Sequence, residues 1–293
     1  MKNREREIKR QLNFLYDKEQ AVEASEKVMR ILEGFGDQNL GNYDKNHDSV
    51  YFSEEDIILI TYGDQVQNTG ENPLDTLKEF LDRTVKNEIN VLHLLPFFPY
   101  SSDDGFSITD YRSVKEEFGD WEDIKSLGSE FDLMFDAVIN HASRESKWAR
   151  GFLQGDPEFR DYFIEVDDSW DLSKVVRPRD NSLITEVEGE EGTRKLWTTF
   201  SKDQIDLNYA NPDVLVKIID LLLFYVEKGA SIIRLDAIAY LWKKSGTSCI
   251  HLEETHRVIR IIRAVLDMVA PNVALITETN VPHEQNVSYF GHG

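Results

Sequence analysis

The sequence predicts an α/β fold organised around a parallel sheet. Short apolar runs rich in β-branched residues alternate with longer stretches of helical period, which implies right-handed parallel βαβ units. We count five such apolar runs before the chain stops at Gly293. A closed barrel needs eight strands, so five runs leave two interpretations open. One is an open doubly wound sheet, and the other is an eight-stranded barrel that is cut shortly after its fifth strand.

The N-terminal part of the chain predicts helix followed by a loop. Residues 4–34 alternate charged and apolar side chains at helical spacing. The apolar residues on one face of this helix are Ile8, Leu12, Leu15 and Tyr16. Residues 35–53 are polar and rich in glycine and asparagine, which favours a loop. We expect residues 1–54 to form a helical segment that packs on the main domain.

Two apolar runs and two helical stretches follow. The runs 57–63 and 89–98 predict the first two strands, and Pro96 marks the end of the second. Residues 73–87 have helical period, and residues 121–128 predict a short helix. This order of strand and helix is that of a βαβ unit.

The second half of the chain contains a long interruption and then returns to the alternation. Residues 131–140 predict the third strand, whereas residues 141–212 carry aromatics, charges and prolines but few long apolar runs. A strong helix is expected over 212–229, with Pro212 near its start and Gly229 past its end. The elements expected after it are a strand at 231–236, a helix at 251–270 and a strand at 273–279.

The formal charge of the chain is −21, because 54 acidic residues outnumber 33 basic ones. Such a chain repels the phosphates of nucleic acid and the headgroups of anionic membranes, so neither is expected as a partner. The single cysteine, Cys249, leaves no partner for a disulfide or a paired-cysteine zinc cluster. No signal peptide and no apolar run of membrane-spanning length is found, so we expect a cytoplasmic protein.

Three of the predicted strands end in the acidic residues Asp136, Asp236 and Glu278. In an α/β barrel, the carboxyl ends of the strands build the active site. Retaining glycosyl transfer uses two carboxyl groups about 5 Å apart, one as nucleophile and one as acid and base. Arg234 precedes Asp236 by two residues and shares its face of the strand, where it can lower the pKa of that carboxyl. Partial burial could keep Glu278 protonated.

Five segments resemble conserved segments of glycoside hydrolase family 13, the α-amylase family. DAVINH (136–141), IIRLDAIAY (232–240) and LITETN (275–280) resemble the first three conserved segments. QIDLNYANP (204–212) resembles the extra segment of the family, and LLPFFPYSSDDGFSITDY (94–111) resembles the loop after its second strand. The resemblance therefore draws on motifs spread over most of the chain.

Within this family the chain looks most like the sucrose phosphorylase branch, which includes glucosylglycerate phosphorylases. The other segments that carry this likeness are VVRPR (175–179), FSKDQIDLNYANP (200–212) and TETNVPHEQNVSYFG (277–291). Sucrose phosphorylases commonly carry a histidine in the place of Tyr111 and another in the place of Asn280. These departures concern the substrate and not the family.

The resemblance covers roughly residues 55–293 and implies an incomplete (β/α)8 barrel, with about five of eight strands and a domain B inserted after strand 3. The expected divisions are the helical segment 1–54, barrel strands 1–3 at 55–136, domain B at 137–212, and 213–293 from barrel helix 3 to just after strand 5. Many family members have a fourth segment with a His-Asp pair, and this chain has none. We therefore expect the amino-terminal part of a longer enzyme, inactive as it stands, and the oligomeric state stays open.

The resemblance implies that Asp236 is the nucleophile and Glu278 the general acid and base, with Arg234 holding Asp236 in place. Substrate-binding residues carried over in the same way are Asp64, Phe106, Tyr111, Asp136, Asn140 and His141. Among these, an aromatic side chain can stack on the apolar face of a sugar ring. His141 is expected near the sugar in the donor subsite.

Arg177 and Arg179 are candidates for receiving phosphate, because a guanidinium group pairs with phosphate in bidentate fashion. A solvated loop accounts for these two residues equally well. Asn140 belongs to a calcium site in some α-amylases, but nothing in this chain completes one. No metal and no organic cofactor are therefore expected.

The implied reaction is retaining α-glucosyl transfer from an α-glucoside, such as sucrose or glucosylglycerate, to inorganic phosphate. Its product would be α-glucose 1-phosphate. One alternative is a hydrolase or transglucosidase that uses the same two carboxyl groups. Another is an inactive fragment or a non-catalytic relative that serves as a binding subunit.

Overall fold

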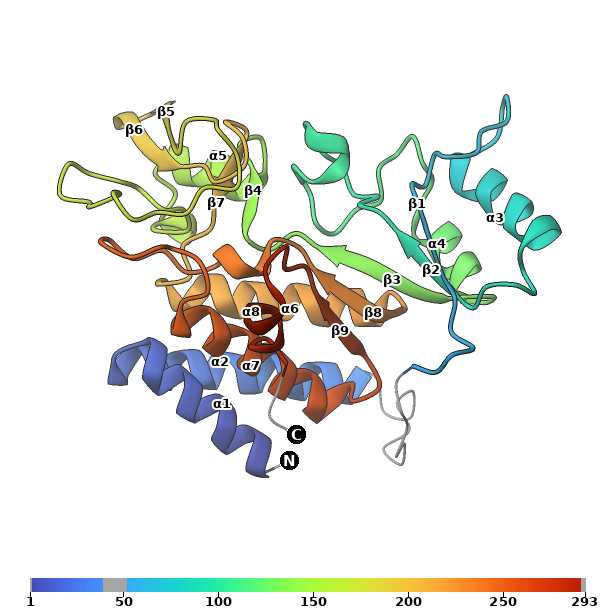
Figure 1. Ribbon diagram of the computed structural model, residues 1–293, viewed down its shortest axis with the longest axis horizontal. Coiled ribbons are helices and arrows are strands. Elements are labelled where there is room, and N and C mark those ends of the chain that lie inside the picture. The colour runs from blue at the N-terminus through green and yellow to red at the C-terminus, as the bar shows by residue number, and fades with distance from the viewer. Residues whose placement is uncertain (1, 39–51, 291–293) are drawn as a thin grey trace.

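A five-stranded parallel sheet forms the centre of the computed structural model, which describes residues 2–38 and 52–290. The strands are β1 Ile58–Thr61, β2 Val91–Leu94, β3 Asp132–Ala137, β8 Ala230–Leu235 and β9 Ala274–Thr277. Their order across the sheet is β1-β2-β3-β8-β9, as can be followed in Figure 1. A doubly wound sheet reverses its strand order at a switch point, and this sheet keeps the chain order throughout. The α/β prediction is confirmed, and the barrel-type interpretation holds.

Helices connect the strands and cover one face of the sheet. The main ones are α3 Pro73–Thr84, α4 Trp121–Gly128, α6 Pro212–Glu227 and α7 Glu253–Val269, with short helices α5 Lys147–Leu153 and α8 His283–Val287. Three 3-10 turns occupy Asp103–Gly105, Pro157–Phe159 and Ile238–Tyr240. α6 begins where the sequence predicts, because the Asn211 side chain accepts the Asp213 N–H and Pro212 has no N–H to leave unpaired. Within the described residues, no helix is long and apolar enough to cross a membrane.

The single helix expected over residues 4–34 is instead a hairpin of two helices, α1 Lys2–Leu15 and α2 Lys18–Gln38. The helix is interrupted at Asp17. The Asp17 carboxylate accepts two backbone N–H groups at the start of α2, at 2.9 and 3.0 Å. This cap competes successfully with a continuous helix. The loop expected at 35–53 was partly wrong, because α2 runs to Gln38; residues 39–51 lie outside the described part.

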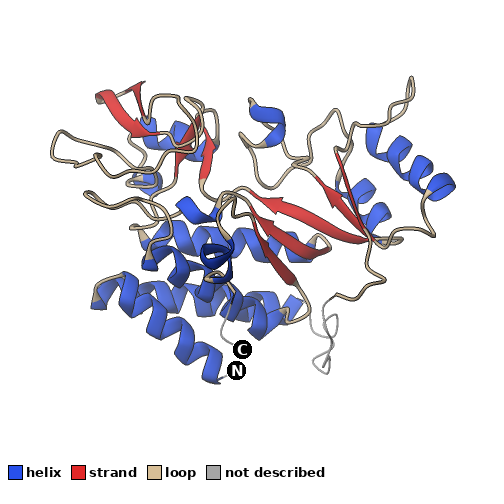
Figure 2. Ribbon diagram, viewed as in Figure 1, coloured by secondary structure: helices blue, strands red, loops and turns tan. Residues whose placement is uncertain are grey.

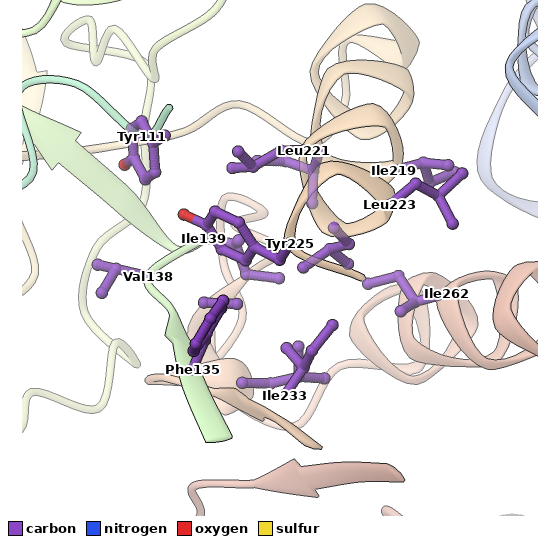
Figure 3. Packing of buried hydrophobic residues seen from close by; sticks show 14 of the residues in the cluster. Tyr111, Phe135, Val138, Ile139, Ile219, Leu221, Leu223, Tyr225, Ile233 and Ile262 are labelled. Carbon is purple, nitrogen blue, oxygen red and sulfur yellow. The ribbon is translucent and has the colours of Figure 1, made fainter. Parts of the chain in front are cut away.

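The helical hairpin, α6 and α7 pack together on one side of the sheet, as Figure 2 shows. The sheet face toward them is apolar: Phe135 of β3 and Ile233 of β8 lie against Tyr225 of α6 and Ile262 of α7 (Figure 3). All four side chains are buried. Burial of a large apolar side chain contributes about 1.5–3 kcal/mol, so this layer fixes the sheet on its helices.

The opposite face of the sheet changes character along the strands. Toward the amino ends of the strands, this face carries a small apolar cluster of Val91, Met134 and Ile232. Because side chains alternate along a strand, the next positions on this face are polar. These positions are His93, Asp136, Arg234, Asp236 and Glu278. The polar end of this face is thus the carboxyl end of the strands.

Two small antiparallel sheets lie between β3 and α6 in the chain. One pairs β4 His141–Ser143 with β7 Gln204–Asp206, and the other pairs β5 Ile184–Gly189 with β6 Gly192–Trp197. β4 follows β3 directly, so Figure 1 shows this segment beyond the carboxyl end of the main sheet. It therefore stands next to the polar positions just described.

Candidate active site

The polar residues at the strand ends meet because the register of the sheet brings them level. Asp136 of β3 lies directly opposite Arg234 of β8. Past the ends of the strands, the Asp236 N–H donates to the Ala137 carbonyl, at 3.1 Å, and the Glu278 N–H donates to the Leu235 carbonyl, at 3.0 Å. Backbone pairing thus extends one step beyond the strands and carries Asp236 and Glu278 to the same edge.

Arg234 stands at the centre of this group. Its Nη1 contacts Oδ1 of Asp136 and lies 3.4 Å from Oδ1 of Asp236, while its Nη2 lies 2.9 Å from Oε1 of Glu278. The guanidinium fork is planar and rigid, so a single arginine fixes the relative places of three carboxyl groups. Asp136 is completely buried, and its other oxygen contacts Nε2 of His93 at 2.8 Å.

A backbone turn ties Glu278 to the residue that follows Asp236. Oε2 of Glu278 accepts the Ala237 N–H at 2.9 Å. Ala237 adopts φ +50°, a left-handed conformation that costs a residue with a Cβ about 1–2 kcal/mol. This turn directs the Ala237 N–H away from strand pairing and toward the Glu278 carboxyl. The residue directly after Asp236 therefore holds the Glu278 carboxyl through its backbone N–H.

Burial dominates the electrostatics of Asp236. It raises the pKa of this carboxyl well above its ordinary value, and the charge of Glu278 adds to the effect. Arg234 acts in the direction that the sequence predicts, but it does not outweigh burial and two neighbouring carboxylates. The Asp236 carboxyl therefore holds a proton more firmly than an isolated carboxyl group would.

Phe106, Tyr111 and His141 support one another beside this group. The Tyr111 hydroxyl donates to the His141 carbonyl at 2.8 Å, and its ring stacks on Trp148 with centroids 4.8 Å apart. Nε2 of His141 contacts the Phe106 carbonyl at 2.9 Å, and burial lowers the pKa of the imidazole, which keeps it neutral. The Phe106 ring lies 5.9 Å from the Arg234 guanidinium, and burial together with the charge of Asp236 raises the pKa of Tyr111, so both aromatic residues flank the carboxyl groups.

Asn140 belongs to a buried network that also touches His141, whose Nδ1 lies 3.3 Å from the Asn140 amide nitrogen. Its amide N–H donates to Asp206 at 2.9 Å, and its carbonyl oxygen accepts from the Lys243 ammonium, also at 2.9 Å. Lys243 pairs with Asp206 as well, at 2.5 Å, and Thr199 donates two further hydrogen bonds to Asp206. The side-chain oxygens of Asn140 and Asp206 are thus bonded to the Lys243 ammonium and are not free for a ligand. No group of three or more His, Cys, Asp or Glu suited to a metal is found in the part of the chain described.

The remaining predicted site residues lie farther out. Asp64 is half-buried just past the end of β1. Arg179 is exposed, but its Nη2 lies 3.9 Å from Asp103 and its guanidinium lies 5.9 Å from the Phe200 ring. Arg177 is exposed and makes no hydrogen bond or ion pair with the described residues. The structure thus brings Arg179, and not Arg177, toward the loop that carries Phe106.

Sequence reasoning missed several residues of this site: His93, Asp103, Phe200, Tyr240 and Lys243. The Phe200 ring lies 5.3 Å from the His141 ring and 5.6 Å from the Tyr240 ring. Tyr240 follows Asp236 closely, since its N–H donates to the Ala237 carbonyl at 3.1 Å, and burial and the charge of Glu278 raise the pKa of its phenol. His93 could have been found, because a histidine two residues after Val91 must share the inner face of β2. The others lie in loops and short 3-10 turns, where the sequence shows no hydrophobic period.

Fold and site together define a barrel-type α/β protein with an arginine-centred group of carboxyls at the strand ends. The catalytic-domain family of α-amylase matches residues 19–293. The chain belongs to this family, glycoside hydrolase family 13.

Several of the similar proteins are phosphorylases. Glucosylglycerate phosphorylase of Spirochaeta thermophila is 51% identical over 282 residues, which are 96% of this chain and 48% of that protein. Sucrose phosphorylase of Streptococcus mutans is 34% identical over 207 residues, 67% of this chain and 42% of that protein. The solved structure of sucrose 6F-phosphate phosphorylase from Thermoanaerobacter thermosaccharolyticum matches with a TM-score of 0.70 and 31% identity, over 78% of this chain and 49% of that one. The chain spans about half the length of the relatives it matches.

Proposed function

We propose that the protein is an α-glucosyl phosphorylase that transfers glucose from an α-glucoside to inorganic phosphate with retention. The observation that carries the proposal is the placement of Asp236 and Glu278 around one guanidinium group. The higher identity to a glucosylglycerate phosphorylase than to a sucrose phosphorylase favours glucosylglycerate as the donor. Tyr111 and Asn280, which stand where sucrose phosphorylases commonly carry histidines, favour it too.

In the first step, the Asp236 carboxylate attacks the anomeric carbon and forms a glucosyl ester. The bond from that carbon to the aglycone oxygen breaks, and Glu278 gives this oxygen its proton, so the aglycone leaves as an alcohol. Because burial raises the pKa of Asp236, this carboxyl must give up its proton before it attacks. Arg234 keeps both groups in place, and Phe106 offers a face for the sugar ring.

In the second step, a phosphate oxygen attacks the same carbon from the side that the aglycone left. Glu278 takes the proton of the phosphate hydroxyl, the ester bond to Asp236 breaks, and α-glucose 1-phosphate is released. Phosphate needs positive charge in a strongly acidic chain, and Arg179 is the better placed of the two candidate arginines. The further donor-subsite roles expected for Asp64, Tyr111, Asp136, Asn140 and His141 are part of the proposal.

The division of the chain is likewise proposed. We assign residues 1–54 to a helical segment, 55–136 and 213–293 to the barrel, and 137–212 to domain B. The two antiparallel sheets between β3 and α6 support the last assignment. We also propose that the protein works in the cytoplasm, since its cysteine, Cys249, is buried and unpaired.

The deciding experiment measures product formation by the whole gene product with and without phosphate. We expect α-glucose 1-phosphate in phosphate buffer and little turnover without phosphate. Free glucose formed at the same rate in both buffers would instead identify a hydrolase. A mechanism-based fluoroglucoside should label a peptide that contains Asp236, and the variant Asp236→Asn should stay unlabelled. Absence of labelling on an active enzyme would contradict the assigned nucleophile.

A further inference from the structure

Within the described residues, the segment that follows Glu278 buries one side chain against the rest of the molecule. Among residues 280–290, Tyr289 alone is buried, at 7% exposure. Its neighbours Val287 and Phe290 are 41% and 63% exposed. A segment with a single buried side chain depends on that side chain for its position.

Tyr289 reaches the loop that follows Asp236. Its hydroxyl and Nδ1 of His251 share a hydrogen bond of 2.6 Å. The ring centroid of Tyr289 also lies 4.5 Å from that of His256, on α7. The contact is therefore both polar and apolar, and its two halves come from different elements.

His251 is itself held in a constrained position. Its backbone adopts φ +55°, a conformation that non-glycine residues keep only when the surroundings impose it. Its N–H donates to the Ala239 carbonyl at 3.1 Å, which ties it to the short turn directly after Asp236. The position of His251 is thus fixed relative to the turn that follows Asp236.

Two bridges consequently join the chain after the nucleophile to the chain after the acid. The inner bridge runs from the Ala237 N–H to the Glu278 carboxyl. The outer bridge is the contact between His251 and Tyr289. Tyr240 links the two bridges along the chain, since its N–H donates to the Ala237 carbonyl at 3.1 Å and it directly follows Ala239, which accepts the His251 N–H.

We propose that His251 and Tyr289 are positioning residues that hold the segment after Glu278 against the loop after Asp236. The inference rests on the proposed function, because its consequence is the placement of the general acid. Neither residue touches the reacting atoms. They act through the backbone of residues 279–290, so that the Glu278 carboxyl stays at the oxygen of the leaving group.

This role makes a distinctive kinetic prediction. A displaced acid slows the departure of an alcohol, which needs a proton, more than the departure of fluoride, which needs little help. A merely structural loss would slow both donors alike. Comparing an α-glucoside with α-glucosyl fluoride therefore separates positioning from general damage.

The test uses Tyr289→Phe, which keeps the ring and removes the hydroxyl. Its matched control is Ser288→Ala, which removes an exposed hydroxyl bonded only within the same segment. In hydrogen–deuterium exchange of the purified protein, Tyr289→Phe should speed exchange about tenfold in residues 279–290 and 249–252, and the control should not. Unchanged exchange in Tyr289→Phe overturns the proposal whatever the activity.

In the active enzyme, Tyr289→Phe should lower kcat/KM about tenfold for glucosylglycerate and less than about threefold for α-glucosyl fluoride. His251→Asn, which tolerates the left-handed backbone but lacks the imidazole ring, should behave in the same way. Equal losses on both donors, or none, overturn the positioning role. If the wild type phosphorolyses no α-glucoside, the proposed function fails and the catalytic role with it, while the exchange result still decides whether the outer bridge holds.

Discussion

At the scale of single residues, the site is built from charges whose places are set by burial. Arg234 contacts three carboxyls, and Lys243 bridges Asn140 and Asp206 without reaching solvent. A buried charge is stable only beside its partner. Removing one member of such a pair therefore lowers the free energy of unfolding by more than the intact pair contributes to it.

Replacing Asp236 should instead raise the free energy of unfolding, because the charged form of its carboxyl is disfavoured in the folded protein. Its folded pKa is raised, so its carboxylate lowers stability at pH above the ordinary aspartate pKa of about 3.9 and has no effect below it. We expect Asp236→Asn to raise the free energy of unfolding by about 1–2 kcal/mol near neutral pH, and the gain to vanish as the pH falls to about 4. Turnover should fall at least about 1,000-fold.

Urea unfolding of wild type and Asp236→Asn at the two pH values measures this gain. A variant that is less stable than wild type at neutral pH would show that the Arg234 contact outweighs burial. The comparison also tests whether the Asp236 carboxylate destabilises the fold, as is common for groups in active sites.

Lys243 gives a second residue-level prediction. Lys243→Met leaves the Asp206 carboxylate buried without its cation, and we expect a loss of about 3–5 kcal/mol in the free energy of unfolding. The control is Lys244→Met, the next residue, whose side chain is 62% exposed and pairs with Glu254 at the surface. That change should cost less than about 1 kcal/mol. Denaturant unfolding of both variants decides, and equal losses would contradict a buried ion pair.

At the scale of elements, Asp203 joins two parts of the site. Its carboxylate accepts hydrogen bonds from Ser102 and Ser107 at 2.6 Å each, and from Ser101, all in the loop after β2. Its own backbone leads into β7. The loop that carries Phe106 is therefore clasped to the inserted segment by one carboxylate.

This clasp should be sensitive to acid. Burial opposes ionisation of Asp203, but the serine hydroxyls outweigh it and lower the pKa. A lowered pKa means that the carboxylate stabilises the fold above about pH 4 and loses this effect as the pH falls toward the folded pKa. We expect Asp203→Asn to lower Tm by about 2–4 °C at neutral pH, with a smaller difference below pH of about 4.

Thermal unfolding across that pH range measures the effect. Asp167→Asn is the matched control, because Asp167 bonds only to Ser169, two residues away, and joins no separate elements. It should shift Tm by less than about 1 °C. A difference for Asp203→Asn that grows with acid would reverse the assigned sign.

The elements themselves were largely predictable. The five strands follow from apolar runs, and α6 follows from its period, its proline and its N-cap. The break between α1 and α2 did not, because Asp17 interrupts a period that continues on both sides of it. A cap is one hydrogen-bonding choice at one residue, and periodicity is insensitive to it.

At the scale of the whole molecule, the five described strands leave the inner face of β1 open. Ile58 and Ile60, both on this face, are 37% and 60% exposed. Exposed apolar side chains on an edge strand favour association between chains. We expect the purified 293-residue polypeptide to self-associate with rising concentration.

Ile60→Lys should reduce this association, because a charge on an edge strand opposes pairing with another strand. Val176→Lys introduces the same charge at a loop residue that is 47% exposed, and should have little effect. Light scattering at several concentrations compares the three proteins. Equal suppression by both substitutions would attribute the change to net charge alone.

The sequence by itself determined the class of the fold and the identity of the two acidic groups, because both are local. An apolar run predicts each strand, and Asp236 and Glu278 follow directly at the ends of two such runs. Arg234 needed only the alternation of side chains along one strand.

Only the tertiary structure decided the partners. Lys243 meets Asn140 across 103 residues, Ser102 meets Asp203 across 101, and His251 meets Tyr289 across 38. These pairs form because loops from different strand ends converge and exclude water, which leaves each polar group only the partners within reach. No periodic pattern encodes that choice, since it depends on which loops come together in space.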